Sequence, residues 1–415
     1  WSFEGLRASD ADNPRGGNFF QAGNSDHINF RRNLLSNSNR RVNQAMIGYV
    51  RSQYGLAEEN ELYNYTRHGI MLAGASNVTV RRNYANSRDY PSAGAIPGIP
   101  ASGDAGGDSG VVIYPGSNNL VENNISERNL SGVNIQAAGY GGTPSSNNRF
   151  FGDISLNDVN SGGVRMISRG DGLLRMPQNT YFENQVVIGA KAIGAWFRGN
   201  KNSVCQNCSV LNSKTHGFAA DPTGPGDGAP TVYIQNSLAY GNSRSGFLFV
   251  GQADFGVKNS NSFGNGSNYT PGSSSKYSNA MSRDPQLGSC KVFIPGSSPM
   301  KGAGTDGNDI GANVLCRYEN GVLTQTQLWN WSTGQFPCGA IVAGVNDKPG
   351  ESCFDVNKRL NVNANGCTLP ANPICKQPAP PADFPPLTGL PGSAPVFYSP
   401  DGKVCPSGYQ PLSNR

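Results

Sequence analysis

The sequence predicts an all-β fold, a right-handed single-stranded parallel β-helix, and three observations lead to that prediction. Short apolar segments recur along the chain; in the regular copies an Asn or Asp closes one segment, and a Gly nine or ten residues later opens the next. Gly accounts for 54 of 415 residues, whereas charged residues make up only 15%. Few windows show the i, i+3, i+4, i+7 spacing of an amphipathic helix. Repeat and composition together favour one long array over two or three ordinary domains.

The repeat places a turn-forming residue at two points of each copy. The five regular copies begin at Asn118, Asn147, Asn179, Asn202 and Thr231. The first apolar segment is closed by Asn83, Asn123, Asp153, Asn184, Asn207, Asn236 and Asn259, and the second is opened by Gly69, Gly110, Gly132, Gly163, Gly194, Gly217 and Gly246. We expect Asn and Gly to adopt left-handed backbone angles at sharp corners, and stacked Asn side chains to bond from coil to coil.

Stacking of the copies explains the repeat, because strands this short cannot bury one face alone. A period in the twenties indicates a β-helix, whereas a propeller repeats every ~40 residues. We expect roughly nine coils between about residues 25 and 280. A closing coil over 281–315 completes a β-helix over 1–315. Residues 316–376 are predicted to form an irregular Cys-rich extension, and residues 377–415 an extended Pro-rich tail.

The nine cysteines are unevenly distributed. Cys205 and Cys208 lie in the middle of the chain, and the others follow near its end: Cys290, Cys316, Cys338, Cys353, Cys367, Cys375 and Cys405. In a Gly- and Pro-rich chain this number indicates disulfides formed in an oxidising compartment, and hence a secreted, extracellular or cell-surface protein. Zinc is the alternative for Cys205 and Cys208, although no second pair of that spacing follows. An odd number leaves one thiol over, or pairs it outside the chain.

Charge and hydropathy exclude two classes of partner. The net charge of +5 comes without runs of Lys or Arg, so nucleic acid is not expected as a partner. No apolar stretch approaches the ~18 residues that a membrane helix needs. No basic-plus-apolar targeting segment opens the chain, and its start has the character of a mature or trimmed terminus. A modest positive field would suit an anionic polymer, and a surface without functional meaning is the alternative.

Several segments resemble a known superfamily. "DPQL" at 284–287 followed by "SPMKGAGTDGNDIGA" at 298–312 resembles the closing coil of secreted bacterial β-helix proteins of the pectate-lyase-like superfamily. "NSLAYGNSRSGF" at 236–247 and "NGVLTQTQLWNW" at 320–331 resemble their internal repeat and the segment that follows their helix. The resemblance covers about residues 25–331. It implies a parallel β-helix and an activity of the polysaccharide-lyase type.

One strand resembles a narrower group within that superfamily. "WFRGN" at 196–200 is similar to the Arg-bearing strand of the chondroitinase B and alginate-lyase group, which continues Arg-His-Gly. Gly199 replaces the His here, and no Lys stands where the group has its catalytic Lys. Only Arg198 is carried over from that group. The signatures of polygalacturonases and alginate epimerases are absent.

Alternation along the strands that follow the repeat glycines predicts two outward columns of side chains. The first column is Met71, Val112, Asn134, Arg165, Trp196, Ala219 and Leu248, and the second is Ala73, Tyr114, Gln136, Ile167, Arg198, Asp221 and Val250. Their middle part offers Tyr114, Asn134, Gln136, Arg165, Trp196, Arg198 and Asp221 over roughly 20 Å, at about 4.8 Å per coil. Aromatic rings stack on sugars, amides bind hydroxyls and arginines bind carboxylates. Long loops beside these strands add to the prediction of a groove for an acidic polysaccharide; the alternative is ordinary strand residues covered by those loops.

The same face suggests a reaction. Elimination from a uronic acid requires that its carboxylate be neutralised and that a base remove the C5 proton. Arg165 and Arg198 are the candidates for neutralisation, and Lys191 or His216 for the base. Asp221 with Asp227, or Asp104 with Asp108, could hold Ca²⁺ as the cofactor of this reaction. The alternative for His216 is a corner residue that makes a structural hydrogen bond.

A second hypothesis is a non-catalytic structural or adhesive protein, such as a subunit of an extracellular fibre or surface layer. β-Helices form rigid rods, and no catalytic signature is complete. Outward apolar residues at the ends of the columns would contact another copy or another surface protein: Met71, Val112, Leu248 and Val250. The odd cysteine and the Pro-rich tail would suit attachment.

Overall fold

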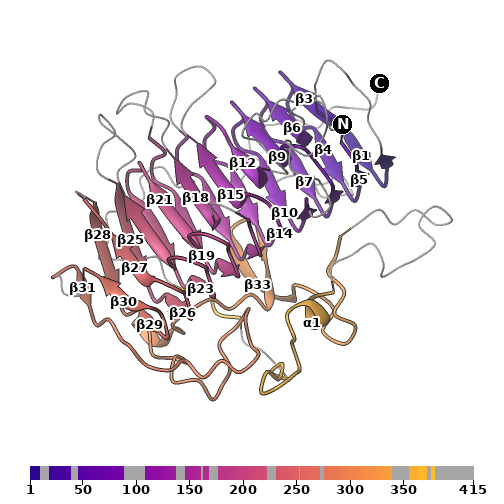
Figure 1. Cartoon of the computed structure of the whole chain (residues 1–415). Helices are drawn as coiled ribbons and strands as arrows, with labels where there is room; N and C mark the ends of the chain where they lie inside the picture. The colour runs from indigo at the N-terminus through magenta and orange to yellow at the C-terminus, as the bar shows by residue number, and fades with distance from the viewer. Residues whose placement is uncertain are drawn as a thin grey trace, which may run out of the picture.

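The computed structural model consists of a long parallel solenoid with a C-terminal segment packed along it (Figure 1). It describes residues 1–9, 18–38, 45–87, 108–136, 145–159, 162–167, 176–221, 230–251, 253–271, 275–338, 355–371 and 375–378. Three parallel sheets, named A, B and C, run the length of the described solenoid. Within the described residues, no helix has the length and apolar character needed to cross a membrane.

Each coil adds one strand to each sheet, and consecutive coils pair in parallel. Sheet A contains β1 (Ser2–Glu4), β4 (Asn29–Arg31), β7 (Leu56–Glu58), β10 (Thr79–Arg81), β13 (Leu120–Glu122), β16 (Arg149–Phe151), β19 (Tyr181–Glu183), β22 (Ser203–Gln206), β25 (Thr231–Gln235), β28 (Asp254–Lys258) and β31 (Tyr277–Ser278). Sheet B contains β2 (Arg7–Ser9), β5 (Leu34–Ser36), β8 (Glu61–Tyr63), β11 (Tyr84–Asn86), β14 (Ile125–Glu127), β17 (Ile154–Leu156), β20 (Val186–Ile188), β23 (Ser209–Leu211), β26 (Leu238–Tyr240) and β29 (Asn261–Phe263).

Sheet C contains the strands that start at or beside the repeat glycines, from β9 to β27, and three more at its ends. They are β3 (Phe20–Gly23), β6 (Ala45–Val50), β9 (His68–Ala73), β12 (Ser109–Ile113), β15 (Ser131–Gln136), β18 (Gly162–Ile167), β21 (Ala195–Arg198), β24 (Phe218–Asp221), β27 (Ser245–Phe249) and β30 (Ser267–Thr270). The described strands therefore form ten three-stranded coils plus β31, and they begin at Ser2 rather than near residue 25. The predicted right-handed single-stranded parallel β-helix is confirmed.

The core is a set of columns in which like side chains stack from coil to coil. Phe150 lies on Phe182 with ring centroids 4.8 Å apart, and Phe218 lies on Phe247 at 4.9 Å. These residues are fully buried between the three sheets. Stacked aromatic pairs add to the free energy that their apolar burial contributes. The period of the sequence thus corresponds to one layer of core per coil.

The corners between sheets A and B hold two columns of side chains where the sequence analysis expected one. Asn123, Asn184, Asn207, Asn236 and Asn259 share the first column and have φ between 45° and 54°. Asn83 and Asp153, which we grouped with them, are one residue further along and belong to the second column, because their strands pair in that register. The first column makes the turn, and the second points into the core.

The second column forms a buried ladder of amides. Asn60 donates to Asn83 Oδ1 at 2.8 Å, Asn83 donates to Asn124 Oδ1 at 2.9 Å, and Asn124 donates to Asp153 Oδ1 at 2.9 Å. The same oxygens also accept from backbone N–H groups of the previous coil. Each buried amide therefore satisfies backbone and side-chain partners at once, as a dry interior requires.

A C-terminal segment returns along the solenoid and covers the outer face of sheet B. Its buried residues include Phe293, Ile294, Met300, Leu315 and Trp329. They pack on outward apolar residues of sheet B, namely Tyr84, Ile125, Ile154, Leu156, Val186, Ile188, Leu211 and Leu238. The helix α1 (Val356–Arg359) belongs to this covering layer, on the lower side of the solenoid in Figure 1. Sheet B is thus buried on both faces from β11 to β26.

The corner asparagines bind the returning backbone in order. Asn236 Oδ1 accepts from Thr305 N at 2.9 Å, and Asn207 Nδ2 donates to Asp309 O at 2.7 Å. Further along, Asn184 Oδ1 accepts from Asn313 N at 3.0 Å. As the segment advances, it meets corner residues of earlier coils, so it runs antiparallel to the direction of stacking. The corner column therefore serves both as a turn and as a docking seam.

A hairpin of β32 (Cys316–Glu319) and β33 (Val322–Gln327) covers the middle of sheet A. Tyr318 Oη donates to Glu183 at 2.7 Å, and the amides of Asn320 and Gly321 donate to Glu122. Burial raises the pKa of Glu122 and that of Glu183 to about 7 each. The hairpin is therefore anchored on two buried carboxyl groups.

A network of ion pairs on sheet A connects the hairpin to earlier coils. Arg81 and Arg82 bridge Glu58 to Glu319, with Arg81 Nε 2.7 Å from Glu58. Burial raises the pKa of Glu58, but Arg81, Arg82 and Arg31 outweigh it and lower the value to about 2. These partners fix the end of the hairpin to the solenoid.

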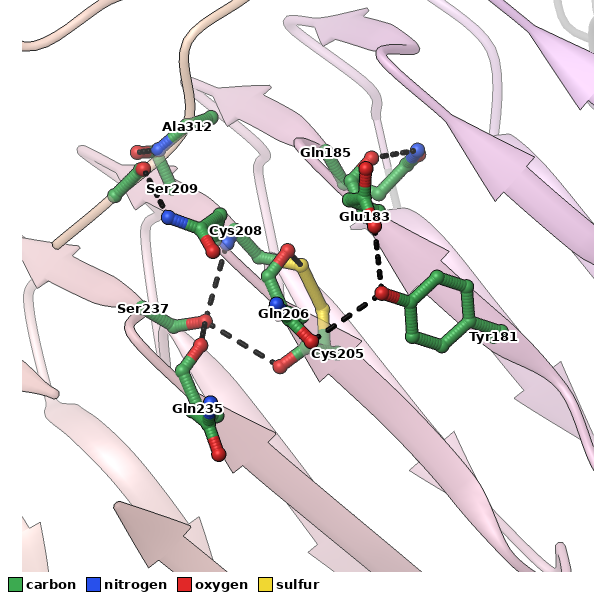
Figure 2. Close-up of a disulfide and its surroundings, with 12 residues drawn as sticks. Tyr181, Glu183, Gln185, Cys205, Gln206, Cys208, Ser209, Gln235, Ser237 and Ala312 are labelled. Carbon is green, nitrogen blue, oxygen red and sulfur yellow. Dashed lines mark hydrogen bonds between the residues drawn. A yellow bond between two sulfur atoms is a disulfide. The ribbon is translucent and has the colours of Figure 1, made fainter. Parts of the chain in front are cut away.

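Three disulfides form among the described residues: Cys205–Cys208, Cys290–Cys367 and Cys316–Cys375. Because Cys205 and Cys208 are bonded to each other, they are not zinc ligands. Figure 2 shows this disulfide in the solenoid wall, where Cys208 N donates to Ser237 Oγ; nearby, Tyr181 Oη donates to Glu183 at 2.6 Å and lies 3.2 Å from Gln206 Oε1. The other two disulfides cross-link residues within the returning segment. Cys338 is buried, while Cys353 and Cys405 lie outside the described residues.

Candidate functional site on the outer face of sheet C

The outer face of sheet C differs from the outer faces of sheets A and B, on which the C-terminal segment packs. The contacts of the C-terminal segment described above go to sheets A and B. The strand register of sheet C confirms the two predicted columns, from Met71 to Leu248 and from Tyr114 to Asp221. Polar and aromatic side chains of successive coils therefore share one face at the spacing of the strands.

Trp196, Arg198 and Asp221 form one group on this face, which we call the Trp196 cluster. Trp196 Nε1 donates to Asp221 Oδ1 at 2.7 Å, and the Arg198 guanidinium carbon lies 5.1 Å from the centre of the indole ring. All three side chains are half-buried. Arg198 occupies one face of the indole, so the contacts support a role for Trp196 in holding the guanidinium.

Arg165 and Asn134 continue the first column beside this cluster. Arg165 pairs in register with Trp196 and is half-buried. Asn134 is fully buried and donates to Ser109 Oγ at 3.3 Å. Its Oδ1 has no hydrogen-bond partner within the described part of the chain. A buried acceptor in this state is uncommon.

A second group surrounds Tyr114, and we call it the Tyr114 cluster. Arg67 donates to Tyr114 Oη at 2.8 Å, and His68 Nε2 lies 3.0 Å from the same oxygen. The Arg67 guanidinium also lies over the Tyr114 ring, 5.6 Å from its centre. Asp108 Oδ2 is 4.0 Å from His68 Nδ1. One phenol is therefore in contact with a cation and an imidazole that has a carboxylate behind it.

His68 is held in its neutral form. Its side chain is fully buried, and burial, followed by the positive charge of Arg67, lowers its pKa well below 6.5. A neutral imidazole has one donor and one acceptor nitrogen. With the acceptor at Nε2, the remaining proton is on Nδ1, facing Asp108.

The structure does not bring the other predicted catalytic residues to these clusters. Lys191 is exposed and precedes β21, whereas Arg198 ends that strand. His216 precedes β24, which Asp221 ends, so five steps of extended chain, roughly 16 Å, separate them. His216 Nδ1 accepts from Ser245 N at 3.2 Å, and burial together with Arg244 lowers its pKa. His216 is therefore a corner residue that makes a structural hydrogen bond, which was the alternative given in the sequence analysis.

Each predicted pair of calcium ligands has one member outside the described residues. Asp227 and Asp104 lie outside them, Asp221 accepts from Trp196, and Asp108 is beside His68. In the described ranges, no group of three or more His, Cys, Asp or Glu could hold a metal ion. The backbone of Gln136 pairs with Ile167 in the second column. The predicted loop walls fall largely outside the described residues.

Arg67, His68 and Asp108 are site residues that the sequence analysis did not group with Tyr114. Asp108 and His68 are 40 residues apart and meet only because their coils are neighbours. One signal was available, since His68 precedes the repeat residue Gly69 just as His216 precedes Gly217. That position brings a side chain to the start of a sheet C strand.

The three sheets and their register define the class of protein, a right-handed single-stranded parallel β-helix with a disulfide-stapled C-terminal layer. No family model matches the chain, and no curated protein matches it. The chain does match several solved structures. It is similar to the catalytic domain of a GH87 alpha-1,3-glucanase, with TM-score 0.37 and 15% identity over 56% of this chain and 48% of that one. The chain thus spans about half the length of that domain.

Two further solved structures are similar over more of their own length. The alginate lyase from Paenibacillus sp. str. FPU-7 has TM-score 0.36 and 13% identity, over 65% of this chain and 87% of that one. Pectate lyase Pel9A has TM-score 0.33 and 15% identity, over 82% and 86%. The similarity concerns the β-helix fold. Several disulfides in one chain are typical of a non-cytoplasmic protein.

Proposed function

We propose that this protein is a secreted carbohydrate-active β-helix that binds an acidic polysaccharide across the outer face of sheet C and cleaves it by β-elimination. The observation that supports this most is the alignment of Arg165, Trp196 and Arg198 with Asp221 on three successive coils. Coils about 4.8 Å apart present these groups as a row along the solenoid axis. A row of fixed guanidinium groups suits a chain with a carboxylate on each unit.

The Trp196 cluster supplies binding with defined geometry. Arg198 is oriented by the indole face, and the indole is fixed by Asp221. A guanidinium held in this way loses less conformational entropy when it binds a carboxylate. Half-burial strengthens the charge interaction relative to bulk water. The net charge of +5 adds a weak attraction for polyanions.

The reaction follows from the same charges. A cation at the uronate carboxylate stabilises negative charge as the C5 proton leaves, and the C5–H electron pair then forms a double bond to C4. The bond from C4 to the glycosidic oxygen breaks, and that oxygen leaves with its electron pair and takes a proton. The product is an unsaturated uronic acid that absorbs ultraviolet light.

The test is to incubate the protein with a panel of uronic-acid polymers, with and without Ca²⁺, and to follow the absorbance of the unsaturated product. We expect absorbance to rise with at least one polymer, and Arg198→Ala to lower the rate at low polymer concentration by about 10²-fold, as for the loss of a hydrogen bond between charged groups. Arg283→Ala is the matched control, because Arg283 is exposed outside sheet C. A flat trace with every polymer would contradict elimination.

A structural or adhesive rod is the second candidate. Val250, one of the residues predicted as contacts, is 40% exposed on the outer face of sheet C and is accessible to a partner. Of the outward residues predicted as contacts, Met71 and Val112 are buried and Leu248 is half-buried. Light scattering over a wide concentration range separates the candidates. Growth in mass with concentration, without turnover of any polymer, would favour the rod.

A further inference from the structure

The Tyr114 cluster has the arrangement of a proton-abstracting centre. Tyr114 Oη contacts Arg67 at 2.8 Å and His68 Nε2 at 3.0 Å. Resting on the proposed function, we infer that Tyr114 is the catalytic base of the elimination, that His68 receives the Tyr114 proton, and that Asp108 positions His68. Arg67 then neutralises the carboxylate of the sugar being cleaved.

The directions of the hydrogen bonds support this order of transfer. Arg67 can only donate, so Tyr114 Oη accepts from it. The phenol proton is then directed at His68 Nε2, which accepts as the neutral imidazole. His68 Nδ1 has no hydrogen-bond partner among the described residues, and the Asp108 carboxylate lies 4.0 Å from it. The charged groups that face His68 are therefore Arg67 on the phenol side and Asp108 on the opposite side.

The step balances without a further oxidant or reductant. The C5–H bond breaks and its proton forms a new bond to Tyr114 Oη, while the original Oη–H proton moves to His68 Nε2. The C5 electron pair forms the C4–C5 double bond, the C4–O bond breaks, and the leaving oxygen takes a proton from water. The hydroxide left by that water then accepts the extra proton of His68. The imidazolium formed at His68 is beside the Asp108 carboxylate, which lowers the free energy of that charge separation.

The position of the cluster fits a polymer along the solenoid axis. Tyr114 shares the second outward column with Arg198, three coils further on, or about 14 Å. Asn134 lies on the coil after Tyr114, with its buried Oδ1 open to a donor. Arg165 and Arg198 would then hold carboxylates of neighbouring units while Arg67 holds that of the reacting unit. Cleavage would therefore occur within the chain.

The test compares three variants on whichever polymer the protein cleaves. Tyr114→Phe keeps the ring but removes the hydroxyl, and we expect turnover to fall 10²- to 10⁴-fold, the usual range for a lost general base, at unchanged polymer affinity. His68→Gln should lower turnover less and abolish the acidic limb of the pH–rate profile. Tyr233→Phe is the control, since Tyr233 is a half-exposed residue of sheet A.

Each outcome decides between the two proposals. If the parent cleaves and Tyr114→Phe is as active as Tyr233→Phe, the inference about Tyr114 is wrong and the proposed function stands. If Tyr114→Phe and His68→Gln lose turnover only together with polymer affinity or thermal stability, the cluster is structural. If the parent binds polymer but yields no unsaturated product, elimination fails and the assignment of the base fails with it.

Discussion

Asparagine has two separate uses in this fold at the scale of single residues. In the corner column it adopts a φ near 50° and binds the returning segment, as Asn184 and Asn207 do. In the buried ladder it satisfies amides of two coils at once, as Asn60 and Asn83 do. The short amide side chain can serve both uses because it tolerates left-handed backbone and carries a donor and an acceptor.

The ladder makes a prediction about stability. Asn83 is 1% exposed; its oxygen accepts from Asn60, and its nitrogen donates to Ala57 O and Asn124 Oδ1. Asn83→Ala should lower the free energy of unfolding by about 3 kcal/mol, because partners on two coils are left buried and unsatisfied. Denaturant unfolding measures this change. Asn29→Ala, at a half-exposed position of sheet A, should change it by less than about 0.5 kcal/mol; equal losses would contradict the role of the ladder.

The Trp196 cluster makes a prediction about affinity. Arg198→Lys keeps the positive charge but removes the planar fork and much of its contact with the indole. We expect about tenfold weaker binding of the polymer, as for a lost bidentate pair. Titration calorimetry measures the difference, with Arg283→Lys as the control. Unchanged affinity in Arg198→Lys would show that Arg198 acts only as diffuse charge.

At the scale of elements, the covering layers of sheets A and B were not predicted. The returning segment is irregular, so periodicity gives no sign of where it packs. A signal existed in the strands themselves: "VVI" at 186–188 is apolar on both faces, as in sheets that are buried on both sides. The hairpin over sheet A has weaker signals, because its anchors Glu122 and Glu183 read as ordinary polar positions.

The hairpin predicts a dependence of stability on pH. Glu122 and Glu183 have pKa values near 7 when folded, against 4.5 in the unfolded chain. Between these values the unfolded state releases protons that the folded state keeps, so stability falls as pH rises from about 4.5 to 7. We expect the melting temperature to drop over this range, and Glu183→Gln to reduce the slope. Scanning calorimetry at several pH values checks both.

The comparison must be made between the parent and the variant. His68 and His216 have pKa values lowered on folding, which contributes the opposite slope below pH 6.5 in both proteins. Their contribution cancels in the difference. Identical slopes in the parent and Glu183→Gln would show that Glu183 does not change its protonation on folding.

The disulfides lead to a prediction about the free energy of unfolding. The disulfides Cys290–Cys367 and Cys316–Cys375 join residues that are 77 and 59 positions apart and so close long loops. Cys205–Cys208 joins residues only 3 positions apart. Loop-closure entropy then assigns about 4 kcal/mol to each long loop and about 2 kcal/mol to the short one. Serine pairs at each bond, compared by denaturant unfolding, should reproduce this order. A larger loss at Cys205–Cys208 would contradict it.

At the scale of the whole molecule, the β-helix and its outer columns could be predicted because both depend on periodicity alone. Alternation after the repeat glycines placed Arg165, Trp196 and Arg198 on one face correctly. The contacts within that face could not be predicted, because Tyr114 and His68 meet through side chains that cross between coils. The closing Asn of each copy was assigned one residue out of register in two coils, since Asn and Asp occur in both corner columns.

The molecule is a rod of three faces, two of which hold its own C-terminal layer over their middle coils. The Tyr114 and Trp196 clusters lie on the third face, three coils apart. An extended polymer can contact both clusters at once only if it runs along the axis of the rod. The division of faces therefore connects the fold to the proposed function.

The most direct test is a crystal structure of the Tyr114→Phe variant with an oligosaccharide of the uronic acid that the parent cleaves. We expect the sugar chain along the outer face of sheet C, with one carboxylate at Arg67 and others at Arg165 and Arg198. A sugar chain bound at another face, or one that crosses sheet C without touching these arginines, would contradict the account.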